Sequence, residues 1–509
     1  MSETNASPDN VDLPSPAVDK TEVISPTVTS PATMADYRAA LMSPWMMETL
    51  KTCVLSGVRI DKEELKKKLT MPRYLRHVMR DCIRYQDQTA MSRQIIGEEE
   101  EEEEDIVPPE TPMVVFINTH SGGRHGPVLK ERLKQLMSEE QVFDLTDVKP
   151  DEFLEHGLGC LEVLASLGDS CAKEVRERMR IMVAGGDGTV GWVLGCLTDL
   201  HKKGREPVPP VGIIPLGTGN DLSRSFSWGG SFPFSWKAAI NRGLLKACTG
   251  RICRLDSWRI SLSMPEDTIV EAPHSLIRTE EFSLDEGLEV EGELPEEVTC
   301  YEGVFYNYFS LGMDAQVAHG FHTLRNEKPY LANGPIANKI IYSGYSCTQG
   351  WFLTPCTSDP SLRGLKNILR LHVKKFNSLE WEQIPVPSSV RAIVALNLHS
   401  YGSGRNPWGN LKPEYLEKRG FVEANVDDGL LEIFGLKQGW HASFVMVELI
   451  SAKHIAQAAA IRLEIRGGEW KDAYMQMDGE PWKQPLRSEF STFVEIKREP
   501  FQSYMISGE

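Results

Sequence analysis

The 509-residue sequence lacks the features that mark membrane-spanning and metal-stapled proteins. No apolar run approaches the ~20 residues that a membrane-spanning helix needs. The ten cysteines are scattered and include no CxxC pair, which argues against zinc modules and a disulfide framework. The first residues, MSETNASPDN, contain neither a basic start with an apolar stretch nor a glycine after Met1. We therefore expect an intracellular protein with reduced core thiols, without a signal peptide or a myristoyl anchor.

The net charge of −17 is concentrated in two segments. Residues 98–105 are acidic throughout, and residues 274–300 contain many acids and a single arginine. Charge runs of this kind are usually solvated linkers or loops, so they say little about the functional surface. The acidic total also argues against nucleic acid as a partner.

The composition divides the first part of the chain into three segments. Residues 1–35 are rich in Ser, Thr and Pro and are expected to be disordered, residues 36–97 are helical, and residues 98–111 form an acidic linker. Within the helical segment, residues 72–85 place apolar side chains on one face and arginines on the other. This helix either docks on the catalytic body or lies on an anionic membrane surface.

From residue 113 the chain alternates apolar strands with helical segments. Such alternation predicts a parallel α/β domain, here residues 112–252, whose site is built by loops at the carboxyl ends of the strands. Beyond it, short strands recur with few helices, which predicts a mainly antiparallel β-sandwich domain over residues 253–497 with an acidic loop at 274–300. Residues 498–509 are left as a C-terminal tail. The fold class is thus α/β followed by β.

Three glycine turns follow three apolar strands of the first domain. They read NTHSGGRHG (118–126), GGDGTVG (185–191) and PLGTGNDLSR (215–224). Glycine lets backbone N–H groups approach phosphate oxygens, and hydroxyl side chains add donors. The second turn alone contains GxGxxG, which is a weak signal, and GxxxxGK[ST] occurs nowhere. Three such turns on one rim of the sheet predict a polyphosphate nucleotide.

Asp187 stands in the second turn, where an unpaired carboxylate would repel phosphate. A cation must therefore lie between them, and Mg²⁺ prefers carboxylate and phosphate oxygens. With Asp221 in the neighbouring turn, the pattern favours a magnesium nucleotide and phosphoryl transfer.

The turns, in this order, resemble the diacylglycerol kinase family. The resemblance rests on GGDGT (185–189), PLGTGND (215–221), DDG (427–429) and MDGE (477–480), and it covers roughly residues 112–497. Relatives of that family include ceramide, sphingosine and NAD kinases, and the first domain is expected to be similar to the NAD kinase and diacylglycerol kinase fold. Because the chain lacks a Cys/His-rich module, it most resembles the short plant-type enzymes of the family.

The resemblance implies roles for matching residues. Asp187, Asp221, Arg224 and Glu480 would be catalytic, with Asp221 and Arg224 organising the junction between the domains and Glu480 acting as general base. Asp187 and Asp428 would be linked to the metal, with Asp427 as the alternative to Asp428. The nucleotide would be contacted by Asn118, Ser121, Gly122, Gly123, Gly185, Gly186, Gly188, Thr189, Gly217, Thr218, Gly219 and Asn220. One departure is Thr119, because the family pattern Asn-Pro-x-Ser-Gly has proline there.

Several of these motifs also have an ordinary structural interpretation. Asp478-Gly479 is a common hairpin turn, and the same holds for DDG at 427–429. The aromatic stretch 225–236 is either a wedge for the bilayer or acyl chains, or a buried loop between domains. His120, His125 and His319 fit no ligand spacing and are taken as structural or surface groups.

The family resemblance implies a reaction and its partners. ATP with Mg²⁺ would phosphorylate the primary hydroxyl of diacylglycerol to give phosphatidic acid. The enzyme would be cytoplasmic and would bind the surface of a membrane, the plasma membrane or the ER, peripherally. Alternatives are a sphingoid-base, ceramide or NAD kinase, and a nucleotide-binding scaffold without turnover.

Overall fold

A computed structural model of the whole chain describes residues 61–88, 107–121, 125–232, 236–265, 272–280, 297–327, 364–437, 452–468 and 470–509. The segment expected to be disordered, 1–35, and the all-acidic run 98–105 lie outside the described residues, as do Gly122 and Gly123. No helix of the described parts is long and apolar enough to cross a membrane. No disulfide joins the cysteines within these ranges.

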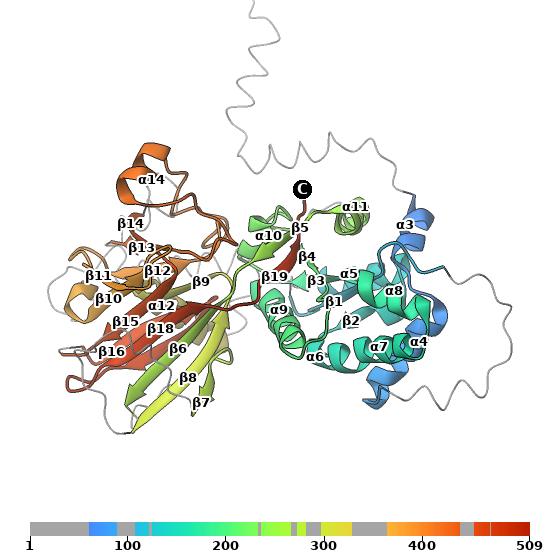
Figure 1. Cartoon of the computed structure of the whole chain (residues 1–509), viewed down its shortest axis with the longest axis horizontal. Helices are drawn as coiled ribbons and strands as arrows, with labels where there is room; N and C mark the ends of the chain where they lie inside the picture. Colours follow the sequence, from blue (N-terminus) through green and yellow to red (C-terminus); the bar gives the residue numbers. More distant parts are fainter. Residues whose placement is uncertain are drawn as a thin grey trace, which may run out of the picture. The chain divides into compact units, whose positions relative to one another are not determined.

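The first domain is built on a six-stranded sheet in the order β2-β1-β3-β4-β19-β5 (Figure 1). Its strands are β1 Met113–Ile117, β2 Val142–Asp144, β3 Arg180–Gly185, β4 Val211–Pro215, β5 Ile252–Leu255 and β19 Ser503–Ile506. All neighbouring pairs are parallel except β19 with β5. The prediction of a parallel α/β sheet is confirmed, with one antiparallel pair at its edge.

Helices cover both faces of this sheet because successive side chains of each strand point to opposite sides. The helical elements are α3 Lys62–Leu69, α4 Arg73–Tyr85, α5 His125–Leu136, η2 Glu139–Gln141, α6 Pro150–Glu152, η3 Phe153–Leu158, α7 Gly159–Ser166, α8 Ser170–Arg178, α9 Asp187–Lys202, α10 Asp221–Ser225 and α11 Trp236–Thr249. On β1, Met113, Val115 and Ile117 share a core with α3, α5 and α11. Val114 and Phe116 share the other core with α4, α7, α8 and α9.

Helix α4 is part of the first domain. Its side chains Leu75, Met79 and Cys82 are fully buried, in the core that also holds Phe116 of the sheet. The apolar face therefore docks on the catalytic body, which is the first of the two interpretations of the 72–85 pattern.

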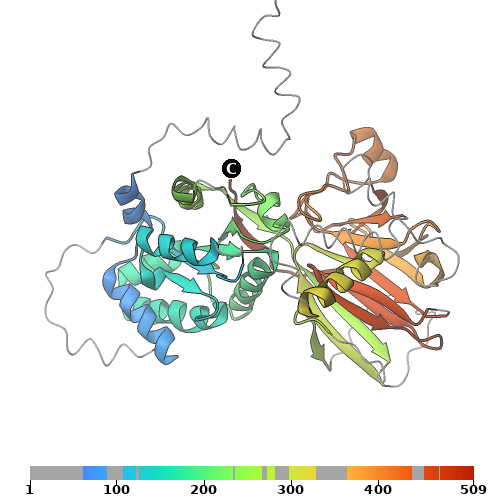
Figure 2. The same ribbon diagram turned by 180° about the vertical axis from the view of Figure 1, so that it is seen from behind.

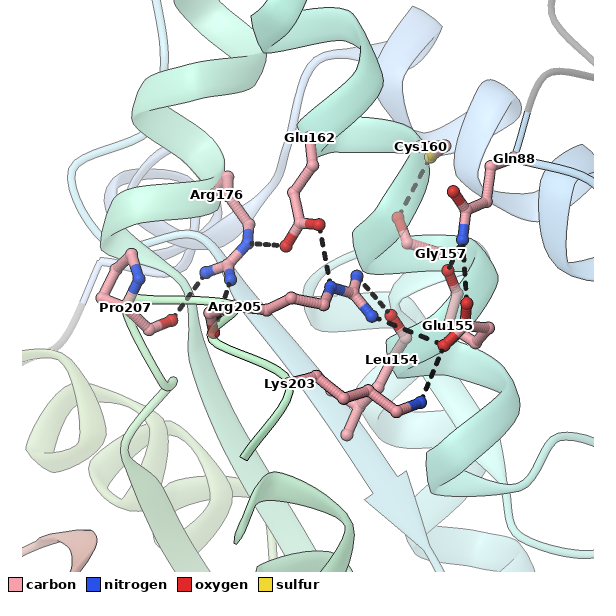
Figure 3. Close-up of polar contacts among 10 residues, drawn as sticks. All are labelled: Gln88, Leu154, Glu155, Gly157, Cys160, Glu162, Arg176, Lys203, Arg205 and Pro207. Atoms are coloured by element: carbon pink, nitrogen blue, oxygen red, sulfur yellow. Dashed lines mark hydrogen bonds and ion pairs between the residues drawn. The ribbon is translucent and has the colours of Figure 1, made fainter. Parts of the chain in front are cut away.

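A π-helical turn, η3, interrupts the helix that runs from α6 to α7 (Figure 3). Such a turn leaves backbone carbonyls without their usual helical partners. The Leu154 carbonyl accepts from the Arg205 guanidinium at 2.9 Å, and the Glu155 carbonyl accepts from the Gln88 amide at 2.8 Å. Glu162 lies between Arg205 and Arg176 and accepts from both, at 2.9 and 2.8 Å. The turn is thus held by side chains on either side of it.

The second domain consists of two antiparallel sheets that share one core. Their orders are β11-β10-β15-β18-β6-β8-β7 and β14-β13-β12-β9-β16-β17. The strands are β6 Trp258–Pro265, β7 Ile277–Thr279, β8 Val298–Phe305, β9 Tyr308–Gly312, β10 Leu369–Lys374, β11 Trp381–Ile384, β12 Ala392–Leu396, β13 Leu431–Leu436, β14 Lys453–Ala458, β15 Ala460–Ile465, β16 Asp472–Met477, β17 Glu480–Pro485 and β18 Thr492–Arg498. Trp258 of β6 and Leu463 of β15 lie in one core with Phe309 of β9 and Trp482 of β17 in the other sheet, as expected for a sandwich.

The described part of the second domain contains few helices. Helix α12, Met313–Glu327, packs along β16 and β17 and is the yellow helix of Figure 2. Within the described residues of this domain, the other helical elements are η7 Leu365–Asn367 and α14 Pro413–Arg419.

The C-terminal residues correct one expectation from the sequence. Residues 498–509 are not a free tail, because β19 lies between β4 and β5 in the first sheet (Figure 1). Met505 and Ile506 are fully buried, and the Trp228 indole donates to the Ile506 carbonyl at 2.7 Å. A strand of four residues is too short to be recognised from its pattern. Within the 225–236 stretch, Phe226 is buried and Trp228 contacts β19, whereas Ser227 and Gly229 are exposed, so the choice between a membrane wedge and a buried loop stays open.

Candidate active site

The three glycine turns meet at one rim of the first sheet, because β1, β3 and β4 are neighbours. The Asn118 N–H donates to the Ala184 carbonyl at 2.9 Å, and the Leu216 N–H donates to the Gly185 carbonyl at 2.8 Å. A Cβ atom on Gly217 would lie 2.6 Å from the Gly186 Cα. The second and third turns are therefore in backbone contact, and glycine is required at that contact.

Space is left over the second turn. A Cβ atom on Gly188 would meet no heavy atom within 4 Å, whereas one on Gly185 would lie 2.6 Å from the Thr189 Cβ. The Thr189 hydroxyl accepts from the Asn118 amide at 3.2 Å, which links the first turn to the second. The first turn thus contacts the second through Asn118 and Thr189, and Gly188 at the start of α9 is unobstructed.

The first turn is anchored where the family pattern has proline. The Thr119 hydroxyl donates to the Asp144 carboxylate at 3.0 Å, and Lys130 pairs with the same carboxylate at 2.9 Å. A Cβ atom on Gly126 would lie 2.4 Å from the Thr119 carbonyl oxygen, so α5 starts in close contact with the turn. Side-chain hydrogen bonds thus hold the position that a ring would otherwise fix.

Asp187 begins α9 and reaches the third turn. Its carboxylate accepts from the Asp221 N–H at 2.9 Å and from the Leu222 N–H at 3.0 Å, so it caps α10. Desolvation and the charge of the Asp221 carboxylate raise the pKa of Asp187 to about 7, although the two backbone donors act in the other direction. A nearby cation would stabilise the charged form of an acid in this position.

Asp221 and Arg224 connect the third turn with a loop of the second domain. The buried Asp221 carboxylate accepts from the Ser400 hydroxyl at 2.5 Å, the Gly404 N–H at 2.8 Å and the Ser403 N–H at 3.1 Å. The Arg224 guanidinium packs so closely on Gly404 that a Cβ atom there would lie 2.9 Å from it. This geometry is that of a junction between the domains.

Asn220 braces the third turn internally. Its side-chain oxygen accepts from the Gly217 N–H at 2.9 Å, and its amide donates to the carbonyls of Gly217 and Gly230 at 2.8 and 2.9 Å. The residue has a φ of 55°, a left-handed conformation that asparagine tolerates. Its side chain shapes the loop, and direct contact with a nucleotide stays a prediction.

Asp478, which the sequence interpretation treated only as a turn residue, is buried and strongly hydrogen-bonded in the structure. Asp478 and Gly479 have φ values of 50° and 86° and close the hairpin between β16 and β17. The Asp478 carboxylate accepts from three successive N–H groups, those of Tyr306, Asn307 and Tyr308, at 2.8 to 2.9 Å. In the sequence, only its place in the MDGE motif (477–480) sets Asp478 apart from an ordinary turn residue.

The environment of Asp478 links it to the first domain. Desolvation raises the pKa of Asp478 to about 6, and the Glu480 charge adds to this effect. The charge of Asp478 in turn contributes to the raised pKa of Asp187. The charge of the MDGE motif thus reaches the acid of the GGDGT motif, which is far from it in the sequence.

Glu480 follows this turn as the first residue of β17. Its Oε2 atom accepts from the Ser275 hydroxyl at 2.7 Å and from the Ser275 N–H at 3.2 Å. Within the described parts of the chain, no hydrogen bond to Oε1 is formed. The Glu480 carboxylate thus has one oxygen bonded to Ser275, and its role as a base stays a prediction.

Asp428 lies in a second group of acids. Its carboxylate accepts from the Leu430 N–H at 2.9 Å, and desolvation, with the charges of Asp256 and Asp427, raises its pKa to about 6. The Asp427 carbonyl accepts from the Gln502 amide at 3.0 Å. The choice between Asp427 and Asp428 as metal-linked acid stays open, and no described group of three acidic, His or Cys side chains could hold a metal ion by itself.

The three singled-out histidines lie as expected of structural or surface groups. His120 and His125 are exposed. His319, on α12, is partly buried and packs edge-on against the Tyr474 ring with centroids 5.3 Å apart.

Known proteins resemble this chain over most of its length. The sequence matches the diacylglycerol kinase catalytic domain over residues 112–252 and the diacylglycerol kinase accessory domain over residues 304–481. Diacylglycerol kinase 7 of Arabidopsis thaliana is 68% identical over 456 residues, which cover 89% of this chain and 92% of that relative. Diacylglycerol kinase 4 of the same plant is 65% identical over 478 residues, 94% of this chain and 98% of the relative.

The matched domains are those of a kinase, a class of transferase. The chain belongs to the diacylglycerol kinase family. The resemblance inferred from its glycine turns is thereby confirmed.

Proposed function

We propose that the protein transfers the γ-phosphoryl group of ATP to the primary hydroxyl of diacylglycerol, giving phosphatidic acid and ADP in lipid signalling. One observation carries the proposal. The glycine turns of a diacylglycerol kinase-type sequence are in backbone contact, with Asp187 between them and open space over Gly188. We also propose that the first domain has an arrangement similar to that of NAD kinases.

Two observations support a magnesium nucleotide at this rim. The position over Gly188 is free for phosphates, and a cation would offset the repulsion between the carboxylates of Asp187 and Asp221. Asp187 would hold Mg²⁺, and Asp428, or Asp427, would be the metal-linked acid of the second group. When bound, the ion offsets negative charge on the phosphate oxygens.

The protein's own groups align the reactants and manage one proton. The N–H groups and hydroxyls of the turns orient the nucleotide, since phosphoryl transfer depends mainly on alignment and charge. Glu480 takes the proton of the acceptor hydroxyl as the oxygen attacks. Asp221 and Arg224 hold the third turn against the loop at 400–404.

The substrate decides where the enzyme works. Diacylglycerol resides in a membrane, so the protein binds that surface peripherally from the cytoplasmic side, at the plasma membrane or the ER. An enzyme must bind the membrane surface to reach a hydrophobic substrate of this kind, whichever helix or loop contacts the lipid.

The test is an acceptor panel with labelled ATP in mixed lipid micelles. Diacylglycerol, sphingosine, ceramide and NAD are offered in parallel, and the Asp187→Ala variant serves as the control. We expect label in diacylglycerol well above the other acceptors and none with the variant. Label mainly in another acceptor would overturn the substrate assignment, and nucleotide binding without any transfer would indicate a scaffold.

A further inference from the structure

Glu480 is held by a segment that lies outside both matched family domains. Ser275 belongs to residues 272–280, which fall between the catalytic match ending at 252 and the accessory match starting at 304. Both of its donors, the hydroxyl and the backbone N–H, bond to the same carboxylate oxygen, Oε2. Two donors on one oxygen fix the orientation of the whole carboxylate.

The segment itself is firmly placed. Leu276 is buried in the core of the sandwich, and its N–H donates to the Pro273 carbonyl at 3.0 Å. Strand β7 then pairs with β8, with Ile277 opposite Glu302. A Cβ atom on Gly303 would lie 2.6 Å from the Ser275 carbonyl oxygen, so β8 accepts the segment only because residue 303 is glycine. Ser275 is therefore presented to Glu480 by fixed backbone on both sides.

We propose that Ser275 is a positioning residue for phosphoryl transfer, which orients Glu480 toward the hydroxyl of the lipid acceptor. The inference rests on the proposed function, because it assigns Glu480 the role of base. With Oε2 occupied by Ser275, Oε1 is left to meet the acceptor. A carboxylate free to rotate would spend part of its time with neither oxygen aligned, and misalignment lowers the rate of the chemical step.

The step balances without a further reactant. The acceptor's hydroxyl oxygen forms a bond to the γ-phosphorus, and its proton passes to Oε1 of Glu480. The bond from the γ-phosphorus to the bridging oxygen breaks, and ADP leaves with the electron pair. Ser275 keeps its own proton throughout and acts on the reaction only through Glu480.

The test compares Ser275→Ala with a matched control, Ser261→Ala. Ser261 also donates to a glutamate, Glu302 at 3.3 Å, on neighbouring strands of the same sheet. We expect Ser275→Ala to lower kcat about tenfold, the effect of losing one hydrogen bond to a charged group, while KM for ATP is unchanged. Ser275→Thr, which keeps the hydroxyl, restores kcat, and Ser261→Ala matches the wild type.

Coupling to Glu480 separates positioning from simple packing. In a Glu480→Gln background, measured in single turnovers, adding Ser275→Ala should cause no further loss. Gly303→Ala, which displaces the Ser275 backbone, should reproduce the kcat loss without deleting the hydroxyl. Thermal unfolding of each variant provides the folding control.

The outcomes separate this inference from the function on which it rests. A Ser275→Ala enzyme with normal kcat beside an inactive Glu480→Gln enzyme would overturn the inference alone. A loss of equal size in the Glu480→Gln background would do the same. A fully active Glu480→Gln enzyme would overturn the role of the base and this inference together, and diacylglycerol phosphorylation would still stand.

Discussion

Asp187, Asp221 and Asp478 place three carboxyl groups at the meeting point of the domains, and each is hydrogen-bonded differently. Asp187 caps a short helix, Asp221 accepts from three groups of one loop, and Asp478 accepts from three successive backbone N–H groups. No basic side chain is among the described donors to these carboxylates. A bound cation would therefore stabilise the charged forms of Asp187 and Asp478 and lower their raised pKa values.

The raised pKa values predict how the stability of the protein depends on pH. The pKa values of Asp187 and Asp478, about 7 and about 6 in the folded protein, exceed the ordinary value of 3.8. The folded state thus binds more protons than the unfolded state between about pH 4 and pH 7. Stability from these groups is fully present below about pH 4 and is lost as the pH rises through 6 to 7.

We expect Asp187→Asn to flatten this dependence. The free energy of unfolding of the nucleotide-free protein should fall from pH 5 to pH 8, and the fall should be smaller in the variant because one titrating acid is gone. Chemical denaturation at a series of pH values measures both slopes. Identical slopes would show that Asp187 does not titrate in this range.

At the scale of elements, the loop at 400–404 is the part of the second domain that holds the third turn. It replaces solvent around the Asp221 carboxylate with the Ser400 hydroxyl and two backbone N–H groups. Tyr401 of the same loop donates to the buried Asp314 of α12 at 3.0 Å, and Gln476 of β16 donates to the same carboxylate at 2.9 Å. A polar chain thus runs from the third turn toward the hairpin that bears Asp478 and Glu480.

Ser400→Ala should weaken this connection. The buried Asp221 carboxylate loses one of its donors, which costs about 1–3 kcal/mol in the free energy of unfolding. We also expect a lower kcat, because the third turn is less firmly held. Ser170→Ala at the exposed start of α8 is the matched control. A Ser400→Ala protein as stable and active as this control would contradict the role of the loop.

Helix α4 offers a second test at this scale, because its pattern alone fits either a membrane surface or the protein body. The buried Met79 and the exposed Arg84 lie on opposite faces of the helix. Met79→Ala should cost about 2–5 kcal/mol in unfolding free energy, as expected for a cavity in a core. Arg84→Ala should leave stability and liposome binding unchanged. Loss of liposome binding with Arg84→Ala would restore the membrane interpretation.

At the scale of the whole molecule, the end of the chain returns to the sheet of the first domain. After the sandwich, β19 pairs with β4 and β5, and Lys246 of α11 donates to the Gly508 carbonyl near the C-terminus. The Trp258 indole donates to the Asn397 side chain at 2.9 Å, and the amide of Asn397 donates to the Tyr306 carbonyl at 2.7 Å. Contacts of this long range hold the Tyr306 turn, which in turn receives the Asp478 carboxylate.

The sequence predicts the parts of this arrangement that are written in local pattern. Apolar strands followed by glycine turns indicate the sheet and its nucleotide rim, because turn chemistry is decided within a few residues. The sequence does not predict β19, the three donors to Asp478 or the bond from Ser275 to Glu480. Each of these depends on a contact between distant segments, and the residues involved are common in ordinary turns and strands.

The most direct test of the account is equilibrium binding of magnesium ATP to Gly217→Ala. The added methyl group would lie 2.6 Å from the Gly186 Cα and must push the second and third turns apart. Gly195→Ala on α9, where a Cβ atom meets nothing within 4 Å, is the matched control. We predict that Gly217→Ala binds the nucleotide at least about tenfold more weakly than the control, a cost of roughly 1.4 kcal/mol. Equal affinity of the two variants would contradict the claim that the glycine turns hold the nucleotide jointly.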